Sequence, residues 1–550
     1  MSGGGRTVVG EYEFALDERP TMPGSPFNPT HPLKLRLAFG AVGACTGIAS
    51  TFGNALTNVN VANLSGPLGL YLALASWLPA IYVAMNATAN LTLVKARIQF
   101  GVPKVTHGLL IAYALIALLQ LPFPGFATAA MTRAISGITA AGLTTVTIYY
   151  MLQAFPAKVR PLALVCGIGF QQLGTPLARL VPVDVLAVNG WHGLHLIEPA
   201  VAAGVLALMK LVPLPPSECG KAFEKLDFVT IGLCIPAMLL LCGVLGLGRI
   251  YWWHDAPFLG WMLASCLPLF ALAILIETHR RHPLLQIDWI TSADIRRFIV
   301  VALLVRLALA EQTYGSVGLL TFGGLDNDQL HILFGLVAFS MALGMIAAAL
   351  LLSQERLRLL VAIAALIIAA GAMLDSSATN LSRPPQLYLS QSLIGFGTTL
   401  FIGPALVYGF LRMIKQGPTH LVSFIVMFNI TQNVGGYAGS ALLGTYQIIQ
   451  ARAHAASLAD HVLGSDPQVI QRIQGGSGAL AGALSDPVLR GAEGAALLGQ
   501  SLAQEANILA YNDVFRLVAM MAVATAAYIF CRIAWLAYEA GRNRRMGIAT

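Results

Sequence analysis

The feature that most constrains the fold is a series of apolar runs, each about as long as a membrane is thick. A helix needs roughly 20 apolar residues to cross the hydrocarbon core of a bilayer. Fourteen runs approach or exceed that length, at about residues 36–58, 69–93, 107–122, 126–151, 161–182, 196–213, 228–248, 257–277, 297–321, 329–352, 358–375, 385–411, 419–447 and 512–538. Of the 550 residues, 57% are hydrophobic and 11% are charged, which excludes an ordinary soluble protein. The sequence therefore predicts an all-α integral membrane protein with about fourteen transmembrane helices.

Lysine and arginine placement predicts how these helices are oriented. Cytoplasmic loops of membrane proteins carry an excess of both residues. With both termini inside, the inside segments hold 23 of them, and the outside segments hold only Arg249, Arg383, Arg452, Arg472 and Arg490. We therefore expect a multi-pass protein with both termini cytoplasmic. The net charge of +8 follows from this topology, and it does not indicate nucleic-acid binding.

Three ionisable residues lie well inside predicted spans. An arginine or aspartate at the centre of a membrane helix costs roughly 2.5–3.5 kcal/mol on insertion scales, so such residues are functional candidates. Arg133 lies in the fourth span, and Arg306 and Glu311 lie in the ninth. Five residues of helix leave Arg306 and Glu311 roughly 140° apart, so they are not expected to pair with each other. Glu311, Tyr314 and Gly318 share one face of their helix.

Side-chain amides form stripes on two other spans. Asn54 and Asn58 follow helical spacing in the first span, and Asn429, Gln432 and Asn433 cluster in the thirteenth. Such a stripe either bonds neighbouring helices, at about 0.6 kcal/mol per contact, or recognises the polar groups of a ligand in a cavity. The sequence leaves both interpretations open.

Short strings recur at half the length of the chain. The string QQLG at 171–174 matches QNVG at 432–435 at an offset of 261, and RAISG from Arg133 matches QSLIG from Gln391 at an offset of 258. Nearly equal offsets are typical of parallel repeats related by an axis along the membrane normal. The sequence thus predicts two related bundles.

Three strings resemble motifs of a known family. RAISG at 133–137 resembles the fourth-span motif of major facilitator proton antiporters, and GTP at 174–176 resembles their fifth-span antiporter motif. WHGLHLIEP at 191–199 resembles the string that opens the sixth span in fourteen-span drug:proton antiporters of the EmrB/QacA type. The resemblance implies a major facilitator fold of two six-helix bundles plus two extra spans. It implies a role in conformational change for Gly137, Gly174, Pro176, Gly435 and Gly436.

The resemblance also implies a domain layout and a set of cavity residues. The expected parts are a cytoplasmic tail (1–34), a first bundle (35–213), a connector with the two extra spans (214–295), a second bundle (296–538) with an outside insertion (448–511), and a second cytoplasmic tail (539–550). Span nine is expected to line the central cavity. The candidates for substrate contact are Arg133, Arg306, Tyr314, Asn54, Asn58, Gln391, Asn429, Gln432 and Asn433.

The insertion is expected to contain a helix that continues span thirteen through QARAHAASLADHV. Asp466-Pro467, the GGSG string at 475–478 and Asp486-Pro487 are expected to interrupt helices after it. A long outside segment at this place again resembles EmrB-type exporters. That resemblance implies two protein partners, a periplasmic adaptor and an outer-membrane channel. A simple cap over the bundle is the alternative.

The leading functional hypothesis is secondary active export, because the chain lacks a phosphate-binding loop before a soluble nucleotide-binding domain. The hypothesis is proton antiport of amphiphilic small molecules across a bacterial inner membrane, with Glu311 and then Glu198 as proton-coupling candidates. Arg133 and Arg306 make aromatic or fatty weak acids at least as plausible as cationic drugs. The alternatives are a proton-independent facilitator or uptake carrier and a non-transporting receptor-like relative. No enzyme activity, metal site or cofactor is expected.

Overall fold

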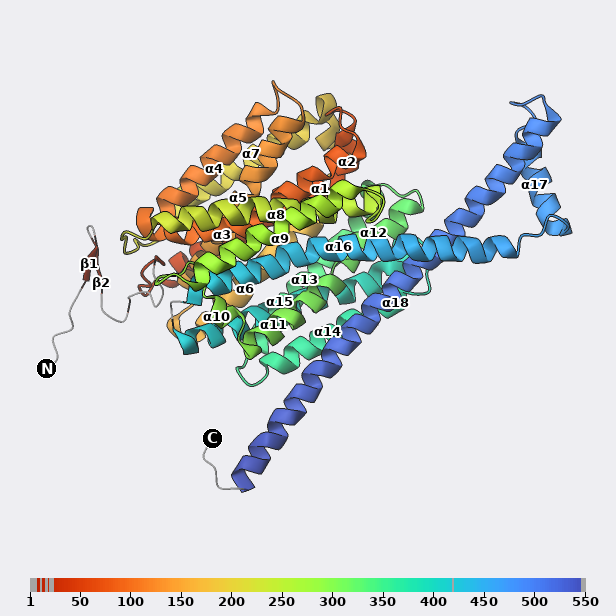
Figure 1. Ribbon diagram of the computed structural model, residues 1–550. Coiled ribbons are helices and arrows are strands. Elements are labelled where there is room, and N and C mark those ends of the chain that lie inside the picture. The colour runs from red at the N-terminus through yellow and green to blue at the C-terminus, as the bar shows by residue number, and fades with distance from the viewer. Residues whose placement is uncertain (1–6, 10–11, 15–17, 19–23, 418–419, 546–550) are drawn as a thin grey trace.

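The computed structural model describes residues 7–9, 12–14, 18, 24–417 and 420–545, and helices dominate it (Figure 1). The long helices are α1 (Leu33–Ser65), α3 (Trp77–Phe100), α4 (Val102–Leu119), α5 (Phe126–Ala154), α6 (Arg160–Ala178), α7 (Val183–Leu211), α8 (Lys225–Tyr251), α9 (Pro257–Thr278), α11 (Ala293–Ala308), α12 (Glu311–Phe322), α13 (His331–Leu350), α14 (Leu357–Asp375), α15 (Tyr388–Gln416), α16 (Leu421–Asp460), α17 (Pro467–Ala479) and α18 (Pro487–Arg545). Short helices are α2 (Leu72–Ala75), η2 (Ala157–Val159), α10 (Ile287–Ile290), η3 (Asn327–Leu330) and η4 (Pro384–Leu387).

About half of the tail before α1 lies outside the described residues. Within it, β1 (Thr7–Val9) and β2 (Tyr12–Phe14) form a small antiparallel hairpin. The end of the tail is tied to the rest of the protein, because the Phe27 amide donates to the Pro216 carbonyl at 3.0 Å. Gln153 of α5 in turn donates from Nε2 to the Phe27 carbonyl at 2.9 Å.

The predicted spans coincide with helices of the structure. Within the described residues, eleven helices are long and apolar enough to cross a membrane. The other three predicted spans, at 161–182, 297–321 and 419–447, fall on α6, on α11 with α12, and on α16. Helices α11 and α12 have 16 and 12 residues, so each alone is too short to cross a membrane. Helices α6 and α16 carry side-chain amides that line a cavity described below.

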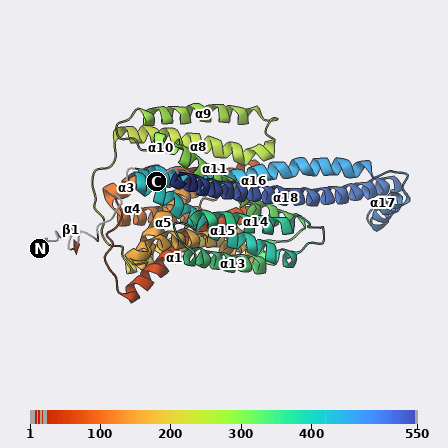
Figure 2. The same cartoon turned by 90° about the horizontal axis from the view of Figure 1, so that it is seen from below.

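The helices form two bundles and a flanking pair. Helices α1 and α3–α7 pack with one another, and α11–α16 pack with one another and with α18. Helix α6 joins the two bundles by packing on α13 and α15, while α3 packs on α16. The pair α8–α9 lies on one side, where α8 contacts both α3 and α16 (Figure 2).

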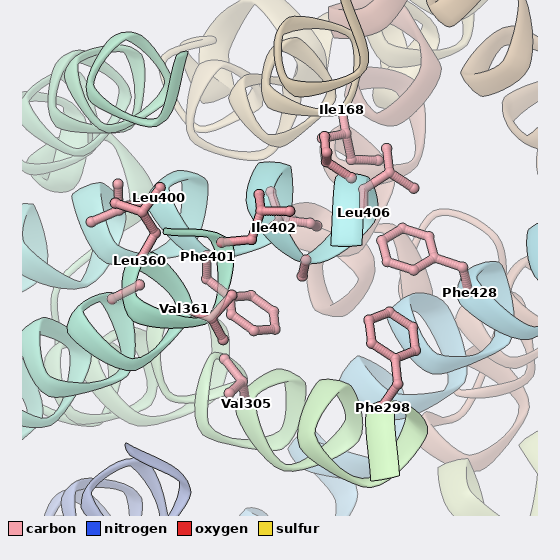
Figure 3. Close-up of a cluster of buried hydrophobic side chains, with 14 of the residues drawn as sticks. Ile168, Phe298, Val305, Leu360, Val361, Leu400, Phe401, Ile402, Leu406 and Phe428 are labelled. Carbon is pink, nitrogen blue, oxygen red and sulfur yellow. The ribbon is translucent and has the colours of Figure 1, made fainter. Parts of the chain in front are cut away.

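The largest apolar cluster lies mainly in the second bundle and crosses into the first. Val305, Phe401 and Phe428 belong to it together with Ile168 of α6 (Figure 3). Membrane helices associate by close packing of this kind, because lipid supplies no hydrophobic drive between them. The cluster therefore helps to hold α6 against the second bundle.

Helices α16 and α18 extend beyond the bundles and meet α17 at their tip (Figure 1). Helix α16 has 40 residues and ends at Asp460, which confirms the predicted continuation of span thirteen. The prediction that GGSG breaks the helix is wrong, because residues 475–478 lie inside α17. The breaks fall before Pro467 and Pro487, where proline at the first helical position favours a helix start.

Candidate functional site: a central cavity and two buried polar clusters

A cavity of about 790 Å³ lies between the two bundles. It is lined by α1, α3, α5 and α6 of the first bundle and by α15 and α16 of the second, with further residues from α8, α11 and α12. The predicted candidates that line it are Asn54, Asn58, Arg306, Asn429, Gln432 and Asn433. A cavity of this size suits a drug-sized molecule.

The charges on the cavity wall are all positive. Arg160, Arg179, Arg249 and Arg306 line it, and no aspartate or glutamate does so among the described residues. Only Arg306 was singled out as a site candidate in the sequence. Arg160 and Arg249 lie in predicted loops and were counted there as topology charges, and Arg179 lies near the end of the predicted fifth span. Apolar side chains, including Phe424 and many aliphatic residues, make up much of the remaining wall. The cavity therefore combines an apolar interior with a positive field.

Arg306 reaches the cavity because two glycines of α16 leave room for it. A Cβ at Gly436 would lie 2.7 Å from Arg306 Nη2, and one at Gly435 would lie 3.4 Å from its Cγ. Arg306 Nε donates to the Gln432 carbonyl at 2.8 Å. The Gln432 side chain faces the cavity, and neither its amide nitrogen nor its oxygen bonds to another described residue. Both atoms are buried beside the cavity wall, so rotation of the Gln432 side chain would bring a donor and an acceptor to a ligand.

The other amides of this stripe serve packing as well as the cavity. Asn429 Nδ2 donates to the Asn86 carbonyl at 2.7 Å, which joins α16 to α3 across the two bundles. Asn433 Nδ2 donates to Asn429 Oδ1 at 2.8 Å. Both interpretations of the stripe therefore hold, because Asn429 bonds a neighbouring helix and all three amides line the cavity.

The first buried polar cluster lies within the first bundle. Arg133 of α5 donates from Nη2 to Glu198 Oε1 of α7, and Thr57 of α1 donates to the same oxygen at 2.9 Å. The side chains of Arg133 and Glu198 are 3% and 1% exposed. Neither lines the cavity. Arg133 was predicted to contact substrate. In the structure its side chain instead points into the first bundle, where it pairs with Glu198 of α7.

The second buried polar cluster contains two acids in the second bundle. Gln391 of α15 donates from Nε2 to Glu311 Oε1 at 3.1 Å and to Asp375 Oδ2 at 2.7 Å. All three residues are at most 5% exposed. Neither carboxylate forms an ion pair within the described residues, and Glu311 Oε2 has no hydrogen-bond partner there. Gln391 was also predicted to contact substrate. It does not line the cavity, because its side chain bonds the two carboxylates.

This second cluster has a distinct chemistry. Two carboxylates this close in a buried site repel each other when both are ionised, and a neutral amide cannot cancel either charge. The arrangement is therefore suited to hold a proton. The sequence did not point to Asp375, because it lies at the predicted end of span eleven and read as a boundary residue.

A break in span nine places Glu311 in this cluster. The span is divided into α11 and α12, with Ala310 N bonded to Leu307 O in a tighter turn. Glu311 begins α12, and a Cβ at Gly315 or Gly318 would lie within 3 Å of Phe515 or Tyr511 of α18. Span nine lines the cavity through Arg306 of α11 and Thr313 of α12, whereas the face that carries Gly315 and Gly318 meets aromatic side chains of α18. Tyr314 is likewise absent from the lining, and its hydroxyl bonds Gln447 Oε1 at 3.4 Å.

The two motif glycines of the first bundle mark close helix crossings. A Cβ at Gly137 of α5 would lie 2.6 Å from the Tyr82 carbonyl of α3. A Cβ at Gly174 of α6 would lie 2.1 Å from Thr51 Oγ1 of α1. Pro176 lies two residues before the end of α6. These positions admit no larger side chain without separating the helices.

A charge network at the end of the protein that is predicted to be cytoplasmic joins the first bundle to α8–α9. Lys95 of α3 pairs with Asp227 of α8 at 2.6 Å, and Arg280 pairs with Asp227, Glu224 and Glu277 at 2.9 Å each. Burial opposes the Arg280 charge, but the three carboxylates raise the pKa of Arg280 above its ordinary value. Arg280 therefore stays protonated and holds the network together.

Comparisons with known proteins agree with this geometry. The profile of the Major Facilitator Superfamily matches residues 43–440. A POT family transporter in complex with a thioalcohol-conjugated peptide is 14% identical and superimposes with a TM-score of 0.55 over 93% of this chain and 100% of that chain. The human organic anion transporter MFSD10 (TETRAN) is 13% identical, with a TM-score of 0.50 over 90% of this chain and 100% of that chain. At these identities the structures show a shared fold. No curated protein matches the sequence.

Proposed function

The chain belongs to the Major Facilitator Superfamily, and we propose that it exports amphipathic organic anions from a bacterial cell by proton antiport. The observation that carries the substrate class is the central cavity, whose charged wall residues are four arginines without a carboxylate among the described residues. Export through an inner membrane, with both termini in the cytoplasm, follows from the resemblance to EmrB/QacA antiporters and from the asymmetric basic residues.

An anion gains from this wall and a cation loses. Opposite unit charges 4 Å apart attract by about 4 kcal/mol at an effective dielectric of 20, and like charges repel by as much. Arg306 and the free amide of Gln432 lie on the same stretch of wall, where they suit a carboxylate or sulfonate. The apolar remainder suits an aromatic ring or an alkyl chain. Aromatic and fatty weak acids are therefore favoured over cationic drugs.

The proton would be carried by the Glu311–Asp375 pair. Its two carboxylates share the amide of Gln391 and lack a basic partner within the described residues. Binding of one proton would reduce the charge of the pair from two negative charges to one. Helix movement that separates the acids would release that proton. Glu198, the second candidate, is paired with Arg133, and opening that pair would leave a buried charge without its partner. We therefore assign coupling to Glu311 with Asp375.

A proton-independent carrier is the second candidate function. It is favoured by the position of both buried clusters outside the cavity lining, since a proton site that never meets the substrate needs an indirect link to it. The two functions differ in one property, which is whether a pH gradient alone drives accumulation.

The test uses the purified full-length protein in proteoliposomes. Labelled salicylate and labelled tetraphenylphosphonium serve as the anionic and cationic probes, each with and without an imposed pH gradient. We expect gradient-driven salicylate transport and little transport of the cation. Arg306→Gln should weaken salicylate transport about tenfold, equivalent to about 1.4 kcal/mol, whereas Arg383→Gln on an exposed loop should not. Preferred transport of the cation would contradict the substrate class, and salicylate equilibration without accumulation would favour the proton-independent carrier.

The projecting segment suggests where the adaptor would bind. Residues beyond the bundle in α16 and α18, together with α17, are largely exposed and reach away from the bundles (Figure 1). We propose this projection as the binding site for the periplasmic adaptor that links the exporter to an outer-membrane channel. Deletion of residues 461–486 should abolish co-purification with an adaptor and leave transport in proteoliposomes intact. Retained co-purification would exclude the tip of the projection as the binding site.

A further inference from the structure

A second cavity lies between α11, α14, α15 and α18, at the end of the second bundle that is predicted to be cytoplasmic. It has a volume of about 100 Å³ and shares no lining residue with the central cavity. Its apolar wall includes Phe298, Val361 and Phe401. Four arginines also line it, namely Arg297, Arg358, Arg412 and Arg532. We call it the arginine groove.

The arginine groove carries surplus positive charge. Its one acidic lining residue, Asp294, pairs with Arg412 at 2.9 Å and with Arg297 at 3.6 Å. Arg358 and Arg532 have neither an ion pair nor a hydrogen bond from their side chains within the described residues. Arg358 instead lies over the Tyr408 ring at 5.6 Å. Two guanidinium groups are thus available to an anion.

The groove lies at the level expected for lipid headgroups. Helices α11 and α14 begin beside it and α15 ends beside it. On α18, Trp535 and Tyr538 are 54% and 64% exposed close to the lining residues Arg532 and Leu536. Tryptophan and tyrosine are enriched at membrane–water interfaces. The basic rim therefore lies near the interface, and the apolar wall continues toward the hydrocarbon.

We propose that the arginine groove binds an anionic phospholipid. Guanidinium groups match phosphate oxygens in a planar, two-pronged geometry, and basic pockets between membrane helices on the cytoplasmic side are suited to anionic headgroups. The phosphate would lie between Arg358 of α14 and Arg532 of α18. An acyl chain would follow the apolar side chains of the groove. A lipid bound in this way would connect α18 to the rest of the second bundle.

The test is a titration of the full-length protein in detergent with phosphatidylglycerol, followed by native mass spectrometry. The variant R358Q/R532Q removes the two unpaired guanidiniums and leaves no carboxylate without its partner. We expect it to bind phosphatidylglycerol roughly 25-fold more weakly, since each of the two basic residues near a membrane surface contributes on the order of fivefold. The matched control is R296Q/R356Q, which removes equal charge from exposed arginines outside the groove and should change binding less than twofold.

Several outcomes would overturn the proposal. Equal losses in both double variants would mean general attraction to basic residues. Equal binding of phosphatidylcholine would mean an apolar site without headgroup recognition, and displacement by inorganic phosphate or glycerol phosphate would mean a site for soluble anions. Thermal unfolding is measured in parallel. If R358Q/R532Q unfolds, R532Q alone on α18 replaces it, with an expected loss of about fivefold, and unchanged binding by that variant would also contradict the proposal.

Discussion

The two buried polar clusters occupy related places in the two bundles but balance their charges differently. Arg133 of α5 and Gln391 of α15 correspond in the internal repeat, and each bonds a buried carboxylate on another helix of its own bundle. In the first bundle, opposite charges cancel. In the second, one neutral amide serves two acids, Glu311 and Asp375.

The comparison shows how one scaffold can hold a buried ion pair in one bundle and two buried acids without a basic partner among the described residues in the other. A buried ion pair is costly to break, because the partner left behind keeps an uncompensated charge. A buried acid pair can lower its own cost by binding a proton. The first cluster is therefore expected to hold α5 and α7 together, and the second to change its charge during the transport cycle.

The largest expected effect is on stability in the first bundle. Arg133→Ala leaves Glu198 buried without its cation and should destabilise the protein by about 3–5 kcal/mol, measured as thermal unfolding in detergent. Adding Glu198→Gln to the same chain should recover much of that loss, because no charge then remains unpaired. A stable Arg133→Ala variant would mean that water or another cation reaches Glu198, and the contrast between the clusters would fail.

An intermediate effect is expected at the corresponding position of the second bundle. Gln391→Leu keeps the approximate size of the side chain but removes the donor shared by Glu311 and Asp375. The loss should be about 1–3 kcal/mol, the cost of leaving buried polar groups without a hydrogen bond. The same unfolding measurement on Gln447→Leu, an amide outside this cluster, provides the control. A loss as large as that of Arg133→Ala would show that the second cluster also carries a full charge.

The smallest effect on stability, and the sharpest test of the comparison, is expected for Glu311→Gln. The amide mimics a protonated acid, so unfolding should change by less than about 1 kcal/mol. Gradient-driven salicylate accumulation should nevertheless be lost, while exchange of salicylate down its own gradient continues. Glu198→Gln, the same substitution in the first bundle, leaves Arg133 unpaired and should destabilise the protein. Full pH-driven accumulation by Glu311→Gln would exclude Glu311 as the proton carrier.

The sequence alone determined the features that depend on local pattern. Run length predicted the helices. The family resemblance implied that Asn54, Asn58, Gln432 and Arg306 line one cavity, and the structure places all four on its wall. The angle between Arg306 and Glu311 correctly excluded a pair between them. The family strings predicted the fold. All of these depend on residues within one or two turns of a helix.

The tertiary structure decided which buried group meets which. Arg133 and Glu198 are 65 residues apart, and Asp375 joins Glu311 only because α14 and α15 pack at a particular register. Tyr314 and Gln391 turn away from the cavity for the same reason, since their neighbours lie on α16, α12 and α14. Hydropathy and helical spacing define a polar face, but the partner of that face depends on how helices distant in the chain cross. The charge balance of each cluster, on which the proposed proton site depends, is therefore a property of the packed bundle.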